Sequence, residues 1–173
     1  MECITCHSLL AADAAYCPQC GTRQPDTPNY DSCRYAAFIS YRHRAPDSDV
    51  AARLQHALET YRIPHEVAAA YGSKRLGKVF RDQDELPATG SLPDSIRKAL
   101  KQSRTLIVVC SAATPDSRWV AQEIETFSAF HGRDRIFAVL ADGKTSDSLP
   151  EALRFRTRIV DGKLERIPAE PLA

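Results

Sequence analysis

Short apolar runs recur along this chain, and segments with helical periodicity separate them. The most apolar run, residues 104–110 (RTLIVVC), is typical of a strand at the centre of a sheet. Four further runs rich in β-branched and aromatic residues are also expected to form strands: 34–41, 78–81, 135–140 and 157–160.

The segments between these runs predict helices. Val50, Leu54 and Leu58 lie on one helical face, in a helix that we expect to begin with a cap at Asp47 or Ser48. Two more helices are expected in residues 91–100 and from residue 117, whereas residues 65–77 show no clear pattern. Alternating strands and helices predict an α/β fold. We expect a flavodoxin-like, five-stranded parallel sheet in the order 2-1-3-4-5, with helices on both faces.

In folds of this class, ligands bind beyond the carboxyl ends of the strands, beside the strand where the order reverses. Three polar segments follow the first three expected strands: SYRHR, DQDELPATG and the start of the helix at Ser117. We therefore expect them to surround one crevice. His43 lies in the first of these segments, but we expect it, like His65, to be a surface residue.

The helix that begins near Ser117 carries two residues that a buried face alone does not explain. Ser117 is a candidate N-cap, and Val120 and Ile124 belong to the expected apolar stripe. Trp119 and Glu123 are four residues apart and project from one side of the helix. One interpretation is a core tryptophan with a solvated carboxylate. The other is an apolar wall that raises the pKa of Glu123 and holds a flat cationic ring, and the expected position at the crevice favours it.

Two Cys-x-x-Cys pairs near the start of the chain indicate a metal site. Four thiolates at this spacing suit tetrahedral Zn²⁺ and leave no open coordination position, so the ion would be structural. A segment this short needs a bound metal to fold. Haem attachment through the CxxCH that ends at His7, and two disulfides, are the alternatives, and both are typical of exported proteins. The expected ligands are Cys3, Cys6, Cys17 and Cys20.

Composition and charge narrow the class of protein. The 173 residues include 23 basic and 22 acidic side chains, a balance that argues against a nucleic-acid-binding surface. The sequence lacks a long apolar segment and a recognisable signal peptide, so we expect no membrane segment in this chain and a cytoplasmic location. The expected organisation is a zinc ribbon (1–22), a linker (23–33), the α/β domain (34–165) and a tail (166–173).

Three motifs in this order resemble the bacterial type of the TIR (Toll/interleukin-1 receptor) domain family. They are FISYR after the first expected strand, VFRDQDELPATGSL around the second, and WVAQE as a WxxxE motif. The resemblance covers about residues 34–159. It implies an enzyme that cleaves NAD⁺ between nicotinamide and ribose, giving ADP-ribose or a cyclic isomer. It also implies self-association with other TIR domains and a role in bacterial antiphage defence.

The resemblance also implies roles for individual residues. Glu123 matches the catalytic glutamate of the enzymatic members. Other positions match residues of the family that surround the substrate: Ser40, Tyr41, Arg42, Asp82, Leu86, Leu92 and Trp119. The family also contains non-catalytic scaffolds that assemble through the loop after the second strand. The proline-bearing loop 84–90 suits such a scaffold, and Glu123 beside Trp119 favours the enzyme.

Overall fold

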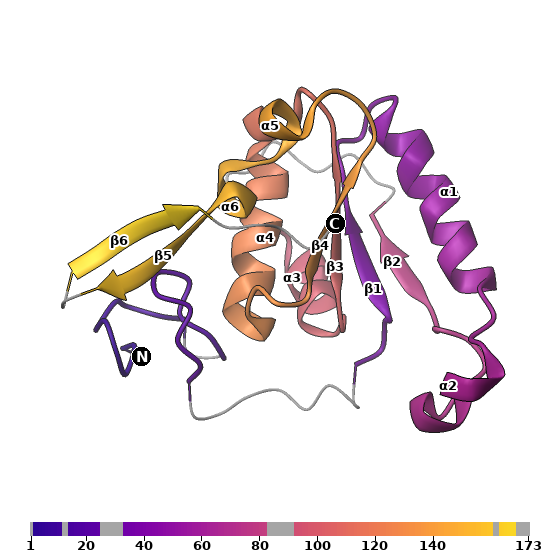
Figure 1. Cartoon of the computed structure of the whole chain (residues 1–173), viewed down its shortest axis with the longest axis horizontal. Helices are drawn as coiled ribbons and strands as arrows, with labels where there is room; N and C mark the ends of the chain where they lie inside the picture. Colours follow the sequence, from indigo (N-terminus) through magenta and orange to yellow (C-terminus); the bar gives the residue numbers. More distant parts are fainter. Residues whose placement is uncertain (1, 12–13, 25–32, 83–91, 161–162, 169–173) are drawn as a thin grey trace.

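The computed structural model describes residues 2–11, 14–24, 33–82, 92–160 and 163–168 (Figure 1). Its main domain is built on a parallel sheet of four strands in the order β2-β1-β3-β4. The expected order of the first four strands is thus confirmed. The strands are β1 (Ala37–Ser40), β2 (Val79–Arg81), β3 (Leu106–Cys110) and β4 (Ile136–Leu140).

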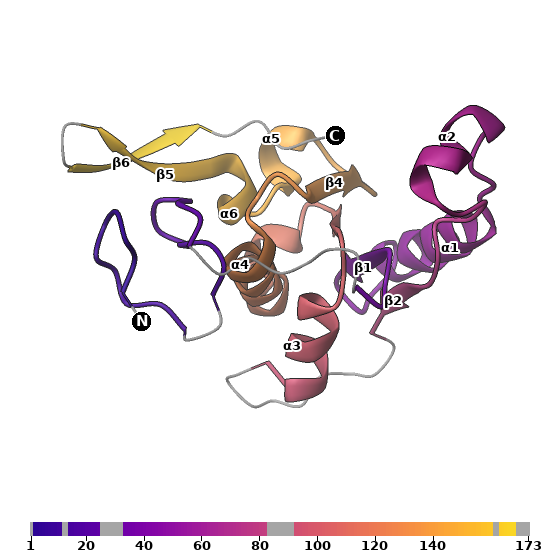
Figure 2. The same cartoon turned by 90° about the horizontal axis from the view of Figure 1, so that it is seen from below.

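Helices cover both faces of this sheet (Figures 1 and 2). The long helix α1 packs on one face, and α3 and α4 pack against each other on the opposite face. Short elements connect these layers, and α2 lies in the segment where the sequence shows no pattern. The helices are α1 (Asp47–Thr60), α2 (His65–Tyr71), α3 (Asp94–Lys101), the 3₁₀ turn η2 (Thr114–Asp116), α4 (Arg118–His131), α5 (Thr145–Ser148) and α6 (Glu151–Arg154).

Two hydrophobic cores follow from the alternation of side chains along the strands. Phe38 of β1 pairs in register with Leu106 of β3, and both face α3 and α4. Ile39, the next residue of β1, faces α1 instead. Strand β1 is buried on both faces, as a central parallel strand must be. The carboxyl end of β1 therefore lies in the middle of the sheet, beside the carboxyl end of β3.

The prediction of a fifth parallel strand in the main sheet is wrong. Residues Phe155–Val160 form β5, but this strand pairs antiparallel with β6 (Lys163–Pro168) in a separate two-stranded sheet. Arginines at positions 156 and 158 recur every second residue. Such a strand does not suit burial on both faces of a parallel sheet, and a neighbouring antiparallel partner needs only a short connection. The sequence 155–168 therefore forms a hairpin that leaves the main sheet.

The cysteine-containing segment forms a small module beside α4 and the β5–β6 hairpin (Figure 1). Its packed part extends to Gln24, whose side chain is buried and donates a hydrogen bond to the Thr22 carbonyl at 2.9 Å. The module thus continues two residues beyond the expected boundary at residue 22. A small apolar cluster lies inside it, formed by Cys3, Leu10, Ala14 and Cys17.

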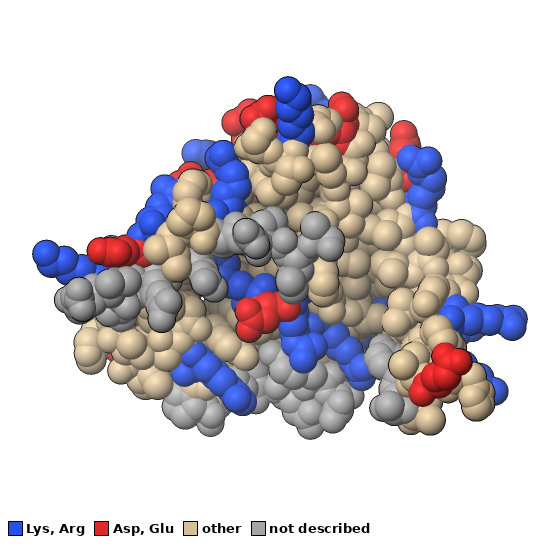
Figure 3. Space-filling view, viewed as in Figure 1, with Lys and Arg blue, Asp and Glu red and all other residues tan. Residues whose placement is uncertain are grey.

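The surface of the described part of the chain carries charges of both signs. On the face shown in Figure 3, basic and acidic side chains are interspersed along the periphery, and a further group of both signs lies just below the centre. Among the described residues, no helix is both long and apolar enough to cross a membrane.

Substitution of Phe127 tests how much the packing of α4 against the core contributes to the stability of the fold. Its side chain is fully buried between α4, α3 and the sheet. We expect Phe127→Ala to lower the free energy of unfolding by about 3–5 kcal/mol, because it removes an aromatic ring and leaves a cavity. Urea denaturation followed by circular dichroism measures this loss. The exposed Glu125 of the same helix gives the control: Glu125→Ala should change stability by less than about 0.5 kcal/mol. A loss below about 1 kcal/mol for Phe127→Ala would contradict the packing described above.

Candidate functional site

A cavity of about 530 Å³ opens beyond the carboxyl ends of β1 and β3, at the N-terminal end of α4. This is where the strand order reverses and where folds of this class bind ligands. Its volume is in the range of small-molecule sites in proteins. The cavity is lined by Tyr41, Arg42, His43, Arg44, Ala113, Asp116, Ser117, Trp119 and Glu123.

Helix α4 brings Trp119 and Glu123 to this cavity. The Ser117 hydroxyl accepts a hydrogen bond from the Val120 N–H at 3.4 Å, so the expected N-cap is confirmed. Val120 and Ile124 anchor the helix in the core. The helix continues to His131, beyond the apolar stripe that predicts it.

Glu123 is a buried carboxyl at one end of the cavity, with only 5% of its surface exposed. The Ser40 hydroxyl, at the end of β1, donates a hydrogen bond to Glu123 Oε2 at 2.5 Å. Burial is the main cause that raises the pKa of Glu123 to about 8; the nearby Asp82 carboxylate raises it further, and the Ser40 hydrogen bond opposes both. At neutral pH this carboxyl therefore keeps its proton for most of the time.

Tyr41 connects the ends of β1 and β2. Its hydroxyl donates a hydrogen bond to the backbone carbonyl of Asp82, and Arg81 Nη1 donates to the same hydroxyl at 3.3 Å. The His43 ring stacks on the Tyr41 ring with 4.7 Å between the centroids. Arg81 is held in turn by Gln55, whose side-chain oxygen accepts from Nε at 2.9 Å. These contacts fix the aromatic wall of the cavity.

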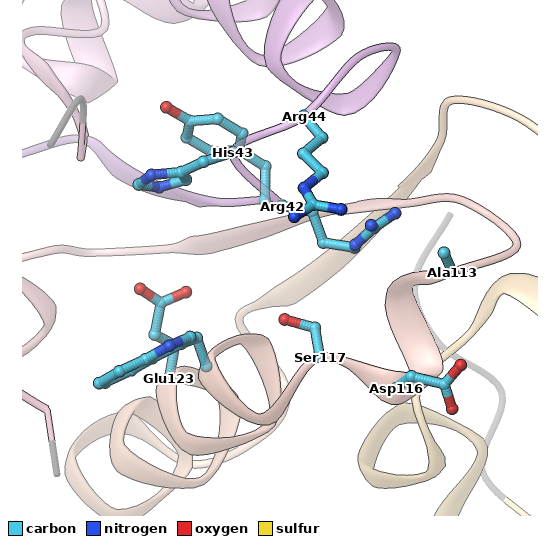
Figure 4. Close-up of a pocket in the computed structure, with 9 residues that line it drawn as sticks. Arg42, His43, Arg44, Ala113, Asp116, Ser117 and Glu123 are labelled. Carbon is cyan, nitrogen blue, oxygen red and sulfur yellow. The ribbon is translucent and has the colours of Figure 1, made fainter. Parts of the chain in front are cut away.

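The opposite end of the cavity is cationic on balance, with the guanidinium groups of Arg42 and Arg44 against the carboxylate of Asp116. Figure 4 shows Arg42 and Arg44 extending toward the end that contains Ala113 and Asp116, whereas His43 lies with Glu123 at the other end. Two guanidinium groups in one cavity repel each other unless an anion lies between them. The arrangement therefore suits a ligand with an anionic part and, some distance away, a group that approaches a carboxyl.

A buried polar junction holds the loop that follows β3. Asp47, in the first turn of α1, is fully buried, and the Ser111 hydroxyl donates to its Oδ2 at 2.9 Å. The Ser111 N–H donates to Thr114 Oγ1 at 2.7 Å. Burial raises the pKa of Asp47 despite the Ser111 hydrogen bond and the charge of Arg42. The sequence suggested Asp47 as a cap of its helix, but its side chain makes no capping hydrogen bond. Asp47 instead connects α1 to the segment that leads into α4.

The structure brings together most, but not all, of the residues expected at the site. Ser40, Tyr41, Arg42, Trp119 and Glu123 all line the cavity or bond to a residue that does. Asp82 is buried behind Tyr41 and acts on the site through its charge and its backbone.

Leu92 lies elsewhere: it packs, partly buried, against the core between α3 and α4. Leu86 lies outside the described residues. The site also contains Asp116, together with His43 and Arg44 of the SYRHR segment expected at the crevice; none of the three was predicted individually as a site residue. Their positions directly after β1 and directly before α4 are the signal that could have identified them.

The four cysteines of the module also come together as a site. Their sulfur atoms all lie within 4.8 Å of one another, with Cys3–Cys20 at 3.6 Å and Cys6–Cys17 at 3.5 Å. Zn–S bonds of about 2.3 Å in a tetrahedron place sulfur atoms about 3.8 Å apart, whereas a disulfide needs about 2.05 Å. The four thiols are unpaired and their separations fit a tetrahedral metal ion.

The module consists of two similar halves. In the first half, the Cys3 N–H donates to the Ser8 carbonyl at 3.0 Å; in the second, the Cys17 N–H donates to the Thr22 carbonyl at 2.9 Å. Each Cys-x-x-Cys turn is followed by a residue with positive φ, at His7 (56°) and at Gly21 (72°). Both turns thus present two thiols from the same backbone geometry, which is typical of metal-binding knuckles.

The fold and the cavity together define an α/β domain with a small-molecule-sized cavity that has a buried glutamate at one end. The family model described as "TIR domain" matches residues 37–166, and the chain therefore belongs to the TIR domain family.

The chain is also similar to two known proteins. The NAD(+) hydrolase ApTIR of Actinoplanes sp. is 37% identical over 111 residues, which cover 64% of this chain and 14% of that protein. The matched part thus spans about one seventh of that relative. The TIR domains in a structure of the activated Roq1 resistosome, which directly recognises the pathogen effector XopQ, are 23% identical with a TM-score of 0.47. That match covers 65% of this chain and 60% of the Roq1 chain.

The raised pKa of Glu123 makes a pH-dependent contribution to stability. The folded chain holds this proton up to about pH 8, whereas the unfolded chain releases it near pH 4.5, so stability falls as pH rises through this window. Glu123→Gln removes the effect. Between pH 5 and pH 9, we expect the free energy of unfolding of the variant to rise relative to that of the wild type, by an amount on the order of a few kcal/mol.

Denaturant titrations at several pH values measure this difference. Glu125→Gln, an exposed substitution on the same helix, should follow the wild-type curve. A stability difference between wild type and Glu123→Gln that stays constant from pH 5 to pH 9 would show that the burial of Glu123 does not affect its ionisation.

Proposed function

We propose that this chain is a TIR-domain enzyme that cleaves the bond between nicotinamide and ribose in NAD⁺. The observation that carries the proposal is the buried carboxyl of Glu123 at one end of a cavity whose other end contains Arg42 and Arg44. The ApTIR relative is an NAD(+) hydrolase, which supports the same substrate and reaction.

The chemistry of NAD⁺ explains why a single carboxyl is sufficient. When the bond from ribose C1′ to nicotinamide N1 breaks, both bonding electrons leave with nicotinamide, which departs as a neutral ring. The leaving group needs no proton, in contrast to ordinary glycosides, which need a second carboxyl as general acid. Positive charge develops on the ribose, and the Glu123 carboxylate stabilises it at short range.

The two ends of the cavity bind different parts of the substrate. Arg42 and Arg44 pair with the pyrophosphate of the substrate. The Trp119 indole faces the cationic nicotinamide ring. A bound cation beside Glu123 lowers the pKa of this carboxyl, so substrate binding favours loss of the proton that burial retains. Water then adds to C1′ and releases a proton, giving ADP-ribose; attack by an adenine nitrogen would give a cyclic isomer.

Assembly of several TIR domains is the second part of the proposal. In an enzyme that works only after self-association, specific activity rises with protein concentration. A scaffold without catalysis shows no nicotinamide release at any concentration. The retained pair of Glu123 and Trp119 at the cavity favours the enzyme.

Nicotinamide release from NAD⁺, measured at low and at high protein concentration, tests the activity. We expect release by the wild type and a rate at least about 100-fold lower for Glu123→Ala, because the variant lacks the charge that stabilises the developing cation. Glu125→Ala, which alters an exposed carboxylate two residues away, should keep the wild-type rate. Equal release by the wild type and Glu123→Ala would contradict the role of Glu123, and no release from a concentrated wild-type sample would favour the scaffold.

We propose further that the four-cysteine module binds one structural Zn²⁺. Its support is the arrangement of the thiols of Cys3, Cys6, Cys17 and Cys20, whose separations fit tetrahedral zinc. The ion holds the two halves of the module together and uses all four thiolates as ligands. Such thiolates persist in a reducing compartment, which agrees with a cytoplasmic location.

Metal analysis of freshly purified, reduced protein should find about one zinc per chain. Cys17→Ser should lose most of this zinc, because three thiolates hold the ion less tightly. Cys33→Ser alters a cysteine outside the module and should keep it. Zinc well below one equivalent in the wild type, or unchanged zinc in Cys17→Ser, would contradict the assignment.

A further inference from the structure

The cysteine module contacts the main domain at the C-terminal end of α4, the helix that carries Glu123. The backbone N–H of Tyr16 donates a hydrogen bond to the Ala129 carbonyl at 2.9 Å. Ala129 also packs against the apolar cluster that contains the cysteines. Pro18 and Gln19, in the second Cys-x-x-Cys turn, line a groove together with Glu125 and Ser128 of α4. The second half of the module thus lies along the last turns of this helix.

The Tyr16 hydrogen bond satisfies a carbonyl that the helix cannot satisfy itself. The last four carbonyls of an α-helix have no N–H partner within the helix. In α4, which ends at His131, the Ser128 carbonyl accepts from Gly132 at 3.0 Å, and the Ala129 carbonyl accepts from the module. The module therefore does at this end what a local capping motif does in most helices.

The side chain of Tyr16 covers the same helix end. Gly132, directly after α4, has φ = 74°, and a Cβ atom at this position would lie 3.0 Å from the Tyr16 ring. The ring therefore lies flush against the backbone that terminates the helix. In the first half of the module the equivalent position holds Glu2, so this contact is specific to the second half.

We propose that the four-cysteine module is a metal-dependent C-terminal cap of helix α4. A segment of about 20 residues does not bury enough surface to fold alone, so the metal ion keeps Tyr16 in place. Loss of the metal removes the hydrogen bond at Ala129 and the ring at Gly132 together. The cap and Glu123 belong to one helix. If the proposed function holds, metal binding in the module thereby contributes to the position of Glu123 at the cavity.

Hydrogen exchange of the full chain, read by mass spectrometry or NMR, tests the cap without any measurement of activity. Removal of metal with EDTA should speed exchange in the last turn of α4, residues 128–132, by about tenfold, and added ZnCl₂ should restore slow exchange. Tyr16→Ala should speed exchange in the same turn with zinc still bound. Tyr16→Phe keeps the ring and the backbone N–H, so it should behave as the wild type.

Two results would overturn the cap. One is unchanged exchange of residues 128–132 after metal removal or in Tyr16→Ala. The other is an equal increase in the central strand β3, because the module would then stabilise the whole domain and not this helix end. Nicotinamide release measured on the same samples separates the two proposals. A lower kcat with an unchanged KM after metal removal supports the link to Glu123. Local exchange changes in a protein without NAD⁺ cleavage would leave the cap intact and contradict the proposed function.

Discussion

The hydrogen bond from Ser40 to Glu123 joins two elements that are 83 residues apart in the chain. A carboxyl buried this deeply is costly unless a polar partner satisfies it. The geometry of this hydrogen bond does not depend on a loop. Ser40 ends a strand that is buried on both faces, and Ile124, beside Glu123, is packed in the core. The hydrophobic packing of the sheet and of α4 therefore sets the position of the Glu123 carboxyl, and a change in that packing affects the cavity directly.

Helix α4 has three separate surfaces. Val120, Ile124 and Phe127 face the core, and Glu123 faces the cavity. The last turn, around Ala129, faces the cysteine module. Since an α-helix behaves as a stiff rod over four turns, these surfaces do not move independently. The arrangement explains how a small cysteine-containing segment at the start of the chain contacts the same helix that carries Glu123, in a domain that has its own core.

The parts of the fold that depend on local pattern could be predicted from the sequence. Alternating apolar runs and helical periodicity are enough for β1 to β4 and for the cap at Ser117, because each follows from a few neighbouring residues. The order of the four strands follows from the fold class that this alternation indicates. The spacing of the cysteines along the sequence was enough to predict their cluster. The partner of β5 could not be found in this way, because the pattern within one short strand does not show which strand lies beside it. Arg44 was missed for a similar reason: the path of the loop after β1 decides whether its side chain enters the cavity.

The two halves of the cysteine module have the same backbone conformation, but the side chains on their surfaces differ. Each half supplies two thiols from a turn with the same backbone geometry. The cysteine cluster depends only on the cysteines and these turns, so the other positions can differ between the halves. The second half presents Tyr16 to a helix, while the first half exposes Ile4 and Leu9 to solvent. The hydrogen bond to α4 thus comes from one half, although both halves contribute equally to the cysteine cluster.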